Sequence, residues 1–127
     1  MSASQIILYV LIALVILSYL RKFLNNRKIE HRDAQEIREK LKNQNNILML
    51  DVRTDPERKT GHIKGSVHIP LNQLRRRLEE LEKFKNKEIV CYCRTGSRSL
   101  TAAVFLQKHG FNVSNLTGGI TAWNYRK

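Results

Sequence analysis

The amino-terminal part of the chain is an unbroken apolar run. Between Ile6 and Leu20 every residue except Ser18 is apolar, and the run contains no charged residue, glycine or proline. A helix that packs against a globular core is usually apolar on one face only, whereas this run is apolar on every face. Small and apolar residues on either side can extend it towards the roughly 18–20 residues that cross a bilayer. We therefore predict a membrane-anchoring helix over residues 1–24.

The charges around this run predict its orientation. No charged side chain precedes the run, whereas four basic residues follow it: Arg21, Lys22, Arg27 and Lys28. Under the positive-inside rule, the amino terminus lies outside and the remainder of the chain lies in the cytoplasm. A cleaved signal peptide fits less well, because the run lacks a basic segment before it and a small-residue cleavage site after it. N-glycosylation triplets at Asn112 and Asn115 would favour the opposite side, but both fall on a predicted strand, and such triplets often arise by chance.

The rest of the chain alternates short apolar runs with amphipathic segments, and we interpret it as a polar linker, residues 25–28, followed by one domain, residues 29–127. Strand-forming runs occur at Ile47–Leu50, Ser66–Ile69, Ile89–Tyr92 and Phe111–Leu116. Helices are predicted from Asp33 to Lys42, from Thr54 onwards, along Leu71, Leu74, Leu78 and Leu81, and from Leu100 to His109. Strands that alternate with helices indicate an α/β fold with a mainly parallel central sheet and helices on both faces.

The candidate chemistry lies in the segment Cys93–Ser99, whose sequence is CRTGSRS. A predicted strand ends just before this segment and a predicted helix begins just after it. Backbone N–H groups in such a strand-to-helix loop form a concavity that favours an anion, and Arg94 and Arg98 add positive charge. Such surroundings lower the pKa of a cysteine thiol to roughly 3.5–7.5, so we predict that Cys93 is a thiolate and a nucleophile for an anionic substrate. The alternative is a small core residue that ends a strand.

Residues near this loop allow more than one interpretation. Asp51 and Arg53 follow a predicted buried strand, where open α/β sheets present ligand-contacting residues. We favour a supporting role for Arg53, in which it pairs with a carboxylate such as Glu57, over direct participation in chemistry. Cys91 is interpreted as a core residue, and a resolving thiol is its less favoured role. Two cysteines so close together on one strand are not a disulfide framework, which agrees with a reducing compartment.

From about Ile29 to the carboxyl terminus, the chain resembles a single-domain rhodanese, a sulfurtransferase module. The cysteine loop carries the main resemblance, with a basic residue after the cysteine, glycine at the fourth position and arginine at the sixth. Three further landmarks occur in the matching order and spacing: Asp51-Val52-Arg53, the segment Gly61–Pro70, and Gly118-Gly119-Ile120 followed by Ala122-Trp123. Each landmark alone is a weak indication, but the four in one order are specific.

The resemblance implies a reaction and a set of site residues. Cys93 would be the catalytic nucleophile, which takes a sulfane sulfur from thiosulfate or a persulfide donor and passes it from a cysteine persulfide to a thiol or cyanide. The loop residues would bind the anionic donor: Arg94, Thr95, Gly96, Ser97, Arg98 and Ser99. Asp51 and Arg53 would support the site. Neither a cofactor nor a metal is implied, and the four histidines are dispersed without metal-ligand spacing.

Two functions of other classes stay open at this point. A cysteine phosphatase also holds a thiolate in an amide cradle, but that family separates cysteine and arginine by five residues, whereas four lie between Cys93 and Arg98. The second is a membrane-tethered binding module without turnover, although such modules often lack the cysteine that is present here. The excess of 23 Lys and Arg over 11 Asp and Glu favours anionic partners such as bilayer lipids and the anionic donor. The scattered positions of the basic residues argue against nucleic acid.

Overall fold

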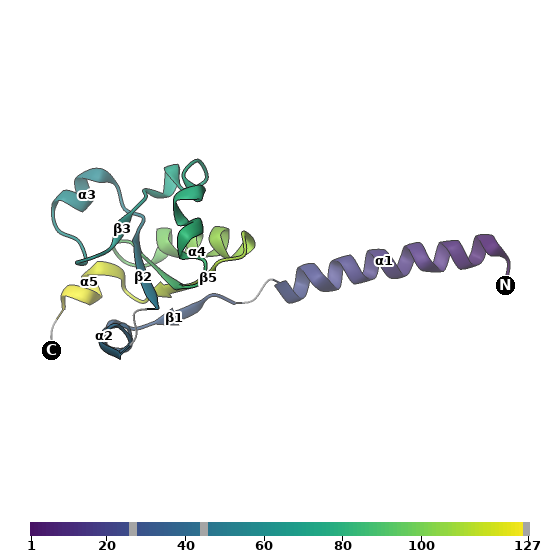
Figure 1. Ribbon diagram of the computed structural model, residues 1–127, viewed down its shortest axis with the longest axis horizontal. Coiled ribbons are helices and arrows are strands. Elements are labelled where there is room, and N and C mark those ends of the chain that lie inside the picture. Colours follow the sequence, from purple (N-terminus) through teal and green to yellow (C-terminus); the bar gives the residue numbers. More distant parts are fainter. Residues whose placement is uncertain (26–27, 44–45, 126–127) are drawn as a thin grey trace.

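A computed structural model describes residues 1–25, 28–43 and 46–125 of the chain. Its first element is the helix α1 (Ala3–Asn25), which projects away from the rest of the molecule in Figure 1. The side chains from Ala3 to Phe23 are exposed, and this stretch is long and apolar enough to cross a membrane. Of the predicted linker, Asn25 belongs to α1, and residues 26 and 27 lie outside the described part of the chain.

The remaining chain is built around one five-stranded sheet. Its strands are β1 (Glu30–Arg32), β2 (Ile47–Asp51), β3 (Val67–His68), β4 (Glu88–Tyr92) and β5 (Asn112–Leu116). The spatial order is β1-β5-β4-β2-β3, and every pairing between these described strands is parallel. The predicted parallel α/β fold is therefore confirmed, with the central strands β4 and β2 formed by the apolar runs. Strand β1 was not predicted, because its sequence Glu-His-Arg is polar and pairs along an exposed edge.

Helical segments connect the strands. They are α2 (Ala34–Asn43), α3 (Asp55–Lys59), α4 (Ser97–Lys108) and α5 (Gly119–Asn124), with two 3₁₀ segments, η1 (Leu71–Gln73) and η2 (Leu78–Phe84). The single helix expected along the leucines is wrong. Leu71 and Leu74 are three residues apart, as are Leu78 and Leu81, and this spacing matches the three residues per turn of a 3₁₀ helix. Leu74 and Leu81 are still fully buried, so the apolar face was predicted but its helix type was not.

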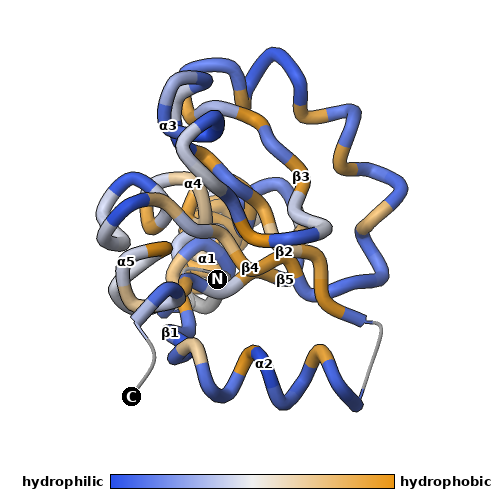
Figure 2. The backbone as a smooth tube through the Cα atoms, turned by 90° about the vertical axis from the view of Figure 1, so that its left-hand side faces the viewer, coloured by the Kyte–Doolittle hydropathy of each residue, from blue (hydrophilic) through white to orange (hydrophobic). Residues whose placement is uncertain are grey.

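Apolar side chains pack on both faces of the sheet. On one face, Leu50, Ile89 and Cys91 pack with α4 through Ala103 and Leu106. On the other face, Val90 and Met49 pack with Ile37 of α2 and Ile120 of α5. Figure 2 shows the hydrophobic strand segments inside and mainly hydrophilic connections around them. Because the strands are parallel, their carboxyl ends meet at one edge of the sheet, and both Asp51 and the loop after Tyr92 lie there.

Candidate active site

The loop after β4 carries Cys93 from the end of a strand into the start of a helix. Cys93 is 1% exposed, and α4 begins at Ser97, three residues earlier than the predicted Leu100. Gly96 precedes this helix with a φ of 117°, a left-handed conformation that a side chain would disfavour. The glycine therefore permits the sharp change of direction that places the first turn of α4 over the sulfur.

Hydrogen bonds converge on the Cys93 sulfur. The Gly96 N–H donates to Sγ over 3.1 Å, and the Ser99 hydroxyl lies 3.4 Å from it. Burial raises the pKa of this thiol, but hydrogen bonds from the Ser99 hydroxyl and from the amides of Ser99, Gly96 and Thr95 outweigh it. The pKa of Cys93 is therefore held below its ordinary value, and the thiolate is favoured. The amide donors belong to the predicted concavity, and the Ser99 hydroxyl is an additional donor.

The two arginines of the loop have different surroundings. Arg98 makes a bidentate ion pair with Glu57 of α3, with Nη1 to Oε1 at 2.6 Å and Nη2 to Oε2 at 2.8 Å. These hydrogen bonds lower the pKa of Glu57 to about 2, so the pair remains ionised over the physiological range. The positive charge of Arg98 is thus balanced by a carboxylate. Arg94 is exposed and forms no ion pair with another described residue.

Asp51 and Arg53 form a buried ion pair beneath the site. Arg53 donates to both carboxylate oxygens of Asp51, over 2.9 and 2.8 Å, and the Tyr92 hydroxyl lies 3.1 Å from Asp51 Oδ2. Burial raises the pKa of Asp51, but the hydrogen bonds from Arg53 hold it below its ordinary value. The expected pairing of Arg53 with a carboxylate is confirmed, but the partner is Asp51 and not the suggested Glu57. The Glu57 carboxylate pairs with Arg98, and Arg53 contacts only the backbone carbonyl of Glu57. A bracing role for Arg53 fits this geometry.

The glycine pair near the carboxyl terminus holds the outer side of the cysteine loop. The amide of Ile120 donates to the Cys93 carbonyl over 2.9 Å, and the Thr121 amide and hydroxyl donate to the Arg94 carbonyl over 3.3 and 3.0 Å. A Cβ atom on Gly119 would lie 2.5 Å from the Arg94 carbonyl oxygen and closer still to that of Cys93. The Gly118-Gly119 pair therefore lies close to the cysteine loop, and this approach requires glycine at position 119.

One residue near the sulfur was missed by sequence reasoning. Asn115 of β5 is 3% exposed and hydrogen-bonds to Ser99 Oγ and to the Gly96 carbonyl, and its amide nitrogen lies 3.3 Å from His31 Nδ1. Asn115 was considered from the sequence only as the first residue of a glycosylation triplet. A polar amide inside a strand whose neighbours are buried was the available signal, because such a group needs hydrogen-bond partners.

Cys91 belongs to the core. It has no exposed surface and packs with Leu50, Ile89 and Leu106 in the cluster below α4. Burial, with a smaller contribution from the nearby Cys93 charge, raises the pKa of Cys91 to about 12. A thiol so reluctant to ionise is poorly suited to a resolving role, which supports the core interpretation.

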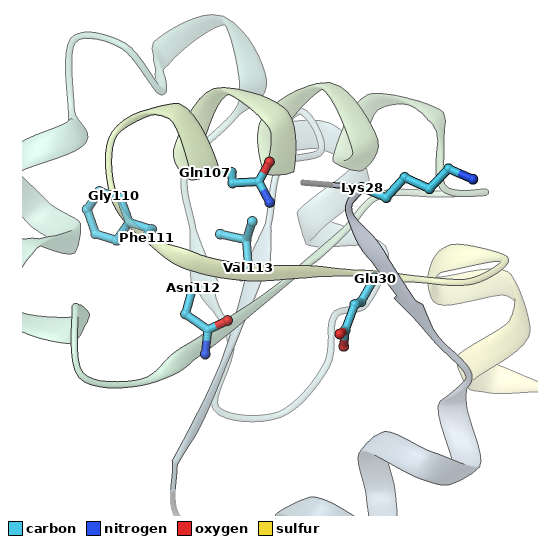
Figure 3. A pocket seen from close by; sticks show the side chains of 7 residues that line it. All are labelled: Lys28, Glu30, Gln107, Gly110, Phe111, Asn112 and Val113. Carbon is cyan, nitrogen blue, oxygen red and sulfur yellow. The ribbon is translucent and has the colours of Figure 1, made fainter. Parts of the chain in front are cut away.

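Two hollows on the surface can be compared as candidate substrate sites. A cleft of about 480 Å³ adjoins the cysteine loop and contains Arg53, Glu57, Arg94 and Thr121 among its lining residues. The hollow in Figure 3 lies at the amino ends of β1 and β5 and is lined by Lys28, Glu30, Gln107, Gly110, Phe111, Asn112 and Val113. Its lining contains no cysteine, serine or threonine side chain, and it lies at the end of the sheet opposite Cys93. The described residues contain no cluster of three His, Cys, Asp or Glu side chains suited to a metal.

Comparisons with known proteins agree with this geometry. Residues 33–126 match the model of the rhodanese-like domain family, so the chain belongs to that family. A sulfurtransferase of Allochromatium vinosum is 34% identical over 92 residues, which cover 72% of this chain and 84% of that protein. The crystal structure of a rhodanese-like domain protein from Staphylococcus aureus matches with a TM-score of 0.71 and 28% identity, over 76% of this chain and 92% of that one.

A second solved structure extends the likeness. The rhodanese-related protein of Thermoplasma volcanium is 32% identical, with a TM-score of 0.68, over 76% of this chain and 95% of that one. The matched part in each comparison is about the size of the domain that follows α1. The domain is thus a member of the rhodanese-like sulfurtransferase family, with an additional apolar helix before it.

Proposed function

We propose that the protein is a sulfurtransferase that carries a sulfane sulfur on Cys93, from thiosulfate or a persulfide donor to a thiol acceptor. The observation that carries this proposal is the placement of Cys93 Sγ, 3.1 Å from the Gly96 N–H and 3.4 Å from the Ser99 hydroxyl. These donors stabilise the charged form of the sulfur and so increase the share of the nucleophilic thiolate.

In the first step, the Cys93 thiolate attacks the outer sulfur of the donor. With thiosulfate, a bond forms between the two sulfur atoms while the donor's S–S bond breaks, and sulfite leaves with the electron pair. The product is a Cys93 persulfide, whose terminal sulfur carries the negative charge. Amide groups of Thr95, Gly96 and Ser99 already favour an anion here, so they stabilise the persulfide as well.

In the second step, the thiolate of the acceptor attacks the outer sulfur of the persulfide. The Cys93 thiolate leaves with the electron pair, and the acceptor carries away the sulfur as its own persulfide. We assign to the exposed Arg94 the attraction of the anionic donor into the adjoining cleft. Ser97 presents its backbone at the start of α4, and Arg98, held by Glu57, fixes the far side of the loop.

We further propose that residues 1–24 anchor the chain in a membrane, with the amino terminus outside, a linker at 25–28 and the domain 29–127 in the cytoplasm. The exposed apolar surface of α1 and the basic residues that follow it support this arrangement. The chain enters the sheet at the amino end of β1, whereas Cys93 lies at the carboxyl edge. The site would then open away from the bilayer, towards donors and acceptors dissolved in the cytoplasm.

An intact-mass measurement tests the proposed chemistry. We expect the full chain in mild detergent, treated with thiosulfate, to gain the mass of one sulfur atom and to release sulfite. Subsequent addition of a small thiol should return the original mass. Cys93→Ser should abolish the gain, whereas Cys91→Ser should retain it because Cys91 lies in the core. A wild-type chain that gains no sulfur would contradict the proposal and favour a binding module without turnover.

A further inference from the structure

A chain of buried polar groups leads from the sulfur into the neighbouring strand. Ser99 Oγ lies 3.4 Å from Cys93 Sγ and 2.5 Å from Asn115 Oδ1. The other end of the Asn115 amide, Nδ2, donates to the Gly96 carbonyl over 3.2 Å. Ser99 has no exposed surface, and Asn115 is 3% exposed. The amide therefore contacts the serine and the glycine that both bond to the sulfur.

The number of protons limits which of these bonds form together. The Ser99 hydroxyl has one proton, but three acceptors lie near it: Cys93 Sγ, the Gly96 carbonyl and Asn115 Oδ1. The two lone pairs of the Gly96 carbonyl already receive the Leu100 N–H and Asn115 Nδ2, each over 3.2 Å. The hydroxyl proton is thus divided between the sulfur and the asparagine oxygen.

We propose that Asn115 is a positioning residue that sets the ionisation of Cys93 by holding Ser99 Oγ and the Gly96 carbonyl at once. When the sulfur is neutral, the Ser99 proton points to Asn115 Oδ1. When the sulfur ionises, the proton turns to the thiolate, which is then the stronger acceptor. The bond from Nδ2 keeps the Gly96–Ser97 peptide in place during this exchange. This inference rests on the proposed use of Cys93 as the reactive thiol.

Other groups that face the sulfur do not offer the same coupling. The charged and titratable groups on the surrounding elements are Asp51 with Arg53, Glu57 with Arg98, Arg94, Cys91 and His31. The first two pairs are closed ion pairs, and Cys91 stays protonated. His31 contacts Asn115 Nδ2 through Nδ1, which must be unprotonated to accept that bond. Replacement of His31 therefore separates the effect of this contact on Asn115 from the effect of the sulfur.

Nuclear magnetic resonance of the full-length chain in detergent micelles tests the proposal without any sulfur donor. We expect the side-chain amide of Asn115 to shift with pH at the same midpoint as the reaction of Cys93 with iodoacetamide. Cys93→Ser should remove that transition, whereas His31→Gln should retain it. The exposed Asn112 on the same strand supplies an internal control that should not shift. An Asn115 amide that stays constant while Cys93 ionises would overturn the proposal.

A substitution gives an independent measurement. Asn115→Asp places a negative charge beside Ser99 and removes the donor to Gly96, so we expect the iodoacetamide midpoint of Cys93 to rise by about 1–3 pH units. Asn112→Asp makes the same charge change at the exposed start of β5 and should leave the midpoint nearly unchanged. An unchanged midpoint in a folded Asn115→Asp chain would contradict the coupling. Persulfide formation is measured separately by mass, so failure of either proposal can be recognised without the other.

Discussion

Cys91 and Cys93 lie two residues apart, are both almost completely buried and belong to the same apolar cluster. Their thiol pKa values are nevertheless shifted in opposite directions. Burial raises the pKa of Cys91 to about 12, whereas the pKa of Cys93 is lowered. Cys91 sits inside β4, paired in register with Leu50 and Asn115. Cys93 lies just past the strand end. The comparison shows that burial alone does not determine the acidity of a thiol.

The difference comes from where the backbone N–H groups point. Within a parallel sheet, the amides around Cys91 are used in pairing with β2 and β5, so none is available for its sulfur. Beyond Tyr92 the pairing stops, and the loop and first turn of α4 have amides without partners in a ladder. These amides point at Cys93 Sγ. The end of a strand therefore supplies the donors that a strand interior lacks.

The largest effect we expect is in the rates of thiol alkylation. Near pH 8, iodoacetamide should modify Cys93 at least about 1,000-fold faster than Cys91 in the folded chain, because only the thiolate reacts and a pKa of about 12 leaves Cys91 protonated. Peptide mass mapping after timed quenching measures both rates. Unfolding in denaturant should bring the two rates together, which separates the effect of the fold from that of neighbouring sequence.

Labelling of Cys93 with a second reagent tests the membrane orientation. A membrane-impermeant methanethiosulfonate that carries a sulfonate group should leave Cys93 unmodified in intact cells and modify it after lysis. Modification in intact cells would contradict the proposed cytoplasmic domain. Comparable rates for Cys91 and Cys93 after lysis would contradict the comparison between the two thiols.

A smaller effect is expected when the support of the cysteine loop is changed. Gly119→Ala would place a Cβ atom against the carbonyls of Cys93 and Arg94 at a φ of 58°. Strain and overlap together should lower the free energy of unfolding by about 2–5 kcal/mol. The displaced loop should also raise the pKa of Cys93 while that of Cys91 stays high. Urea unfolding and the alkylation profile measure the two effects.

Gly65→Ala is the matched control for this substitution. Gly65 also has a positive φ, 80°, but no atom lies within 4 Å of the position that its Cβ would take. Only conformational strain of about 1–2 kcal/mol is expected, with no change in the alkylation of Cys93. An equal decrease in the free energy of unfolding in the two variants would show that contact between Gly119 and the loop carbonyls does not affect stability.

The sequence predicted those parts of the fold that depend on a periodic or local pattern. The apolar run before Cys93 indicated a buried strand, and the segment after it indicated a loop into a helix, although α4 begins three residues before the predicted start. Strand β1 was missed because its polar residues are stabilised by pairing with β5, which no local pattern records. The partners of Arg53 and Arg98 were also beyond prediction, because two carboxylates compete for two guanidinium groups and only tertiary packing decides the pairing.

The ion pair between Arg98 and Glu57 gives the smallest effect, and its dependence on pH has a definite sign. Glu57 has a pKa lowered from 4.5 to about 2 in the folded chain, so its stabilisation is complete above pH 4.5 and is lost as the pH falls towards 2. The Glu57 side chain is 29% exposed, so solvent screens the pair, and we expect Glu57→Gln to lower the free energy of unfolding by about 1–2 kcal/mol at pH 7.

Glutamine at position 57 can still cap α3, so this substitution measures the effect of the charge alone. Glu82→Gln, which breaks a more exposed pair with Lys85, should cost less. Urea unfolding monitored by Trp123 fluorescence should show the difference between wild type and Glu57→Gln shrinking below pH 4.5, and a difference that stays constant down to pH 2 would show that the ion pair does not hold the loop.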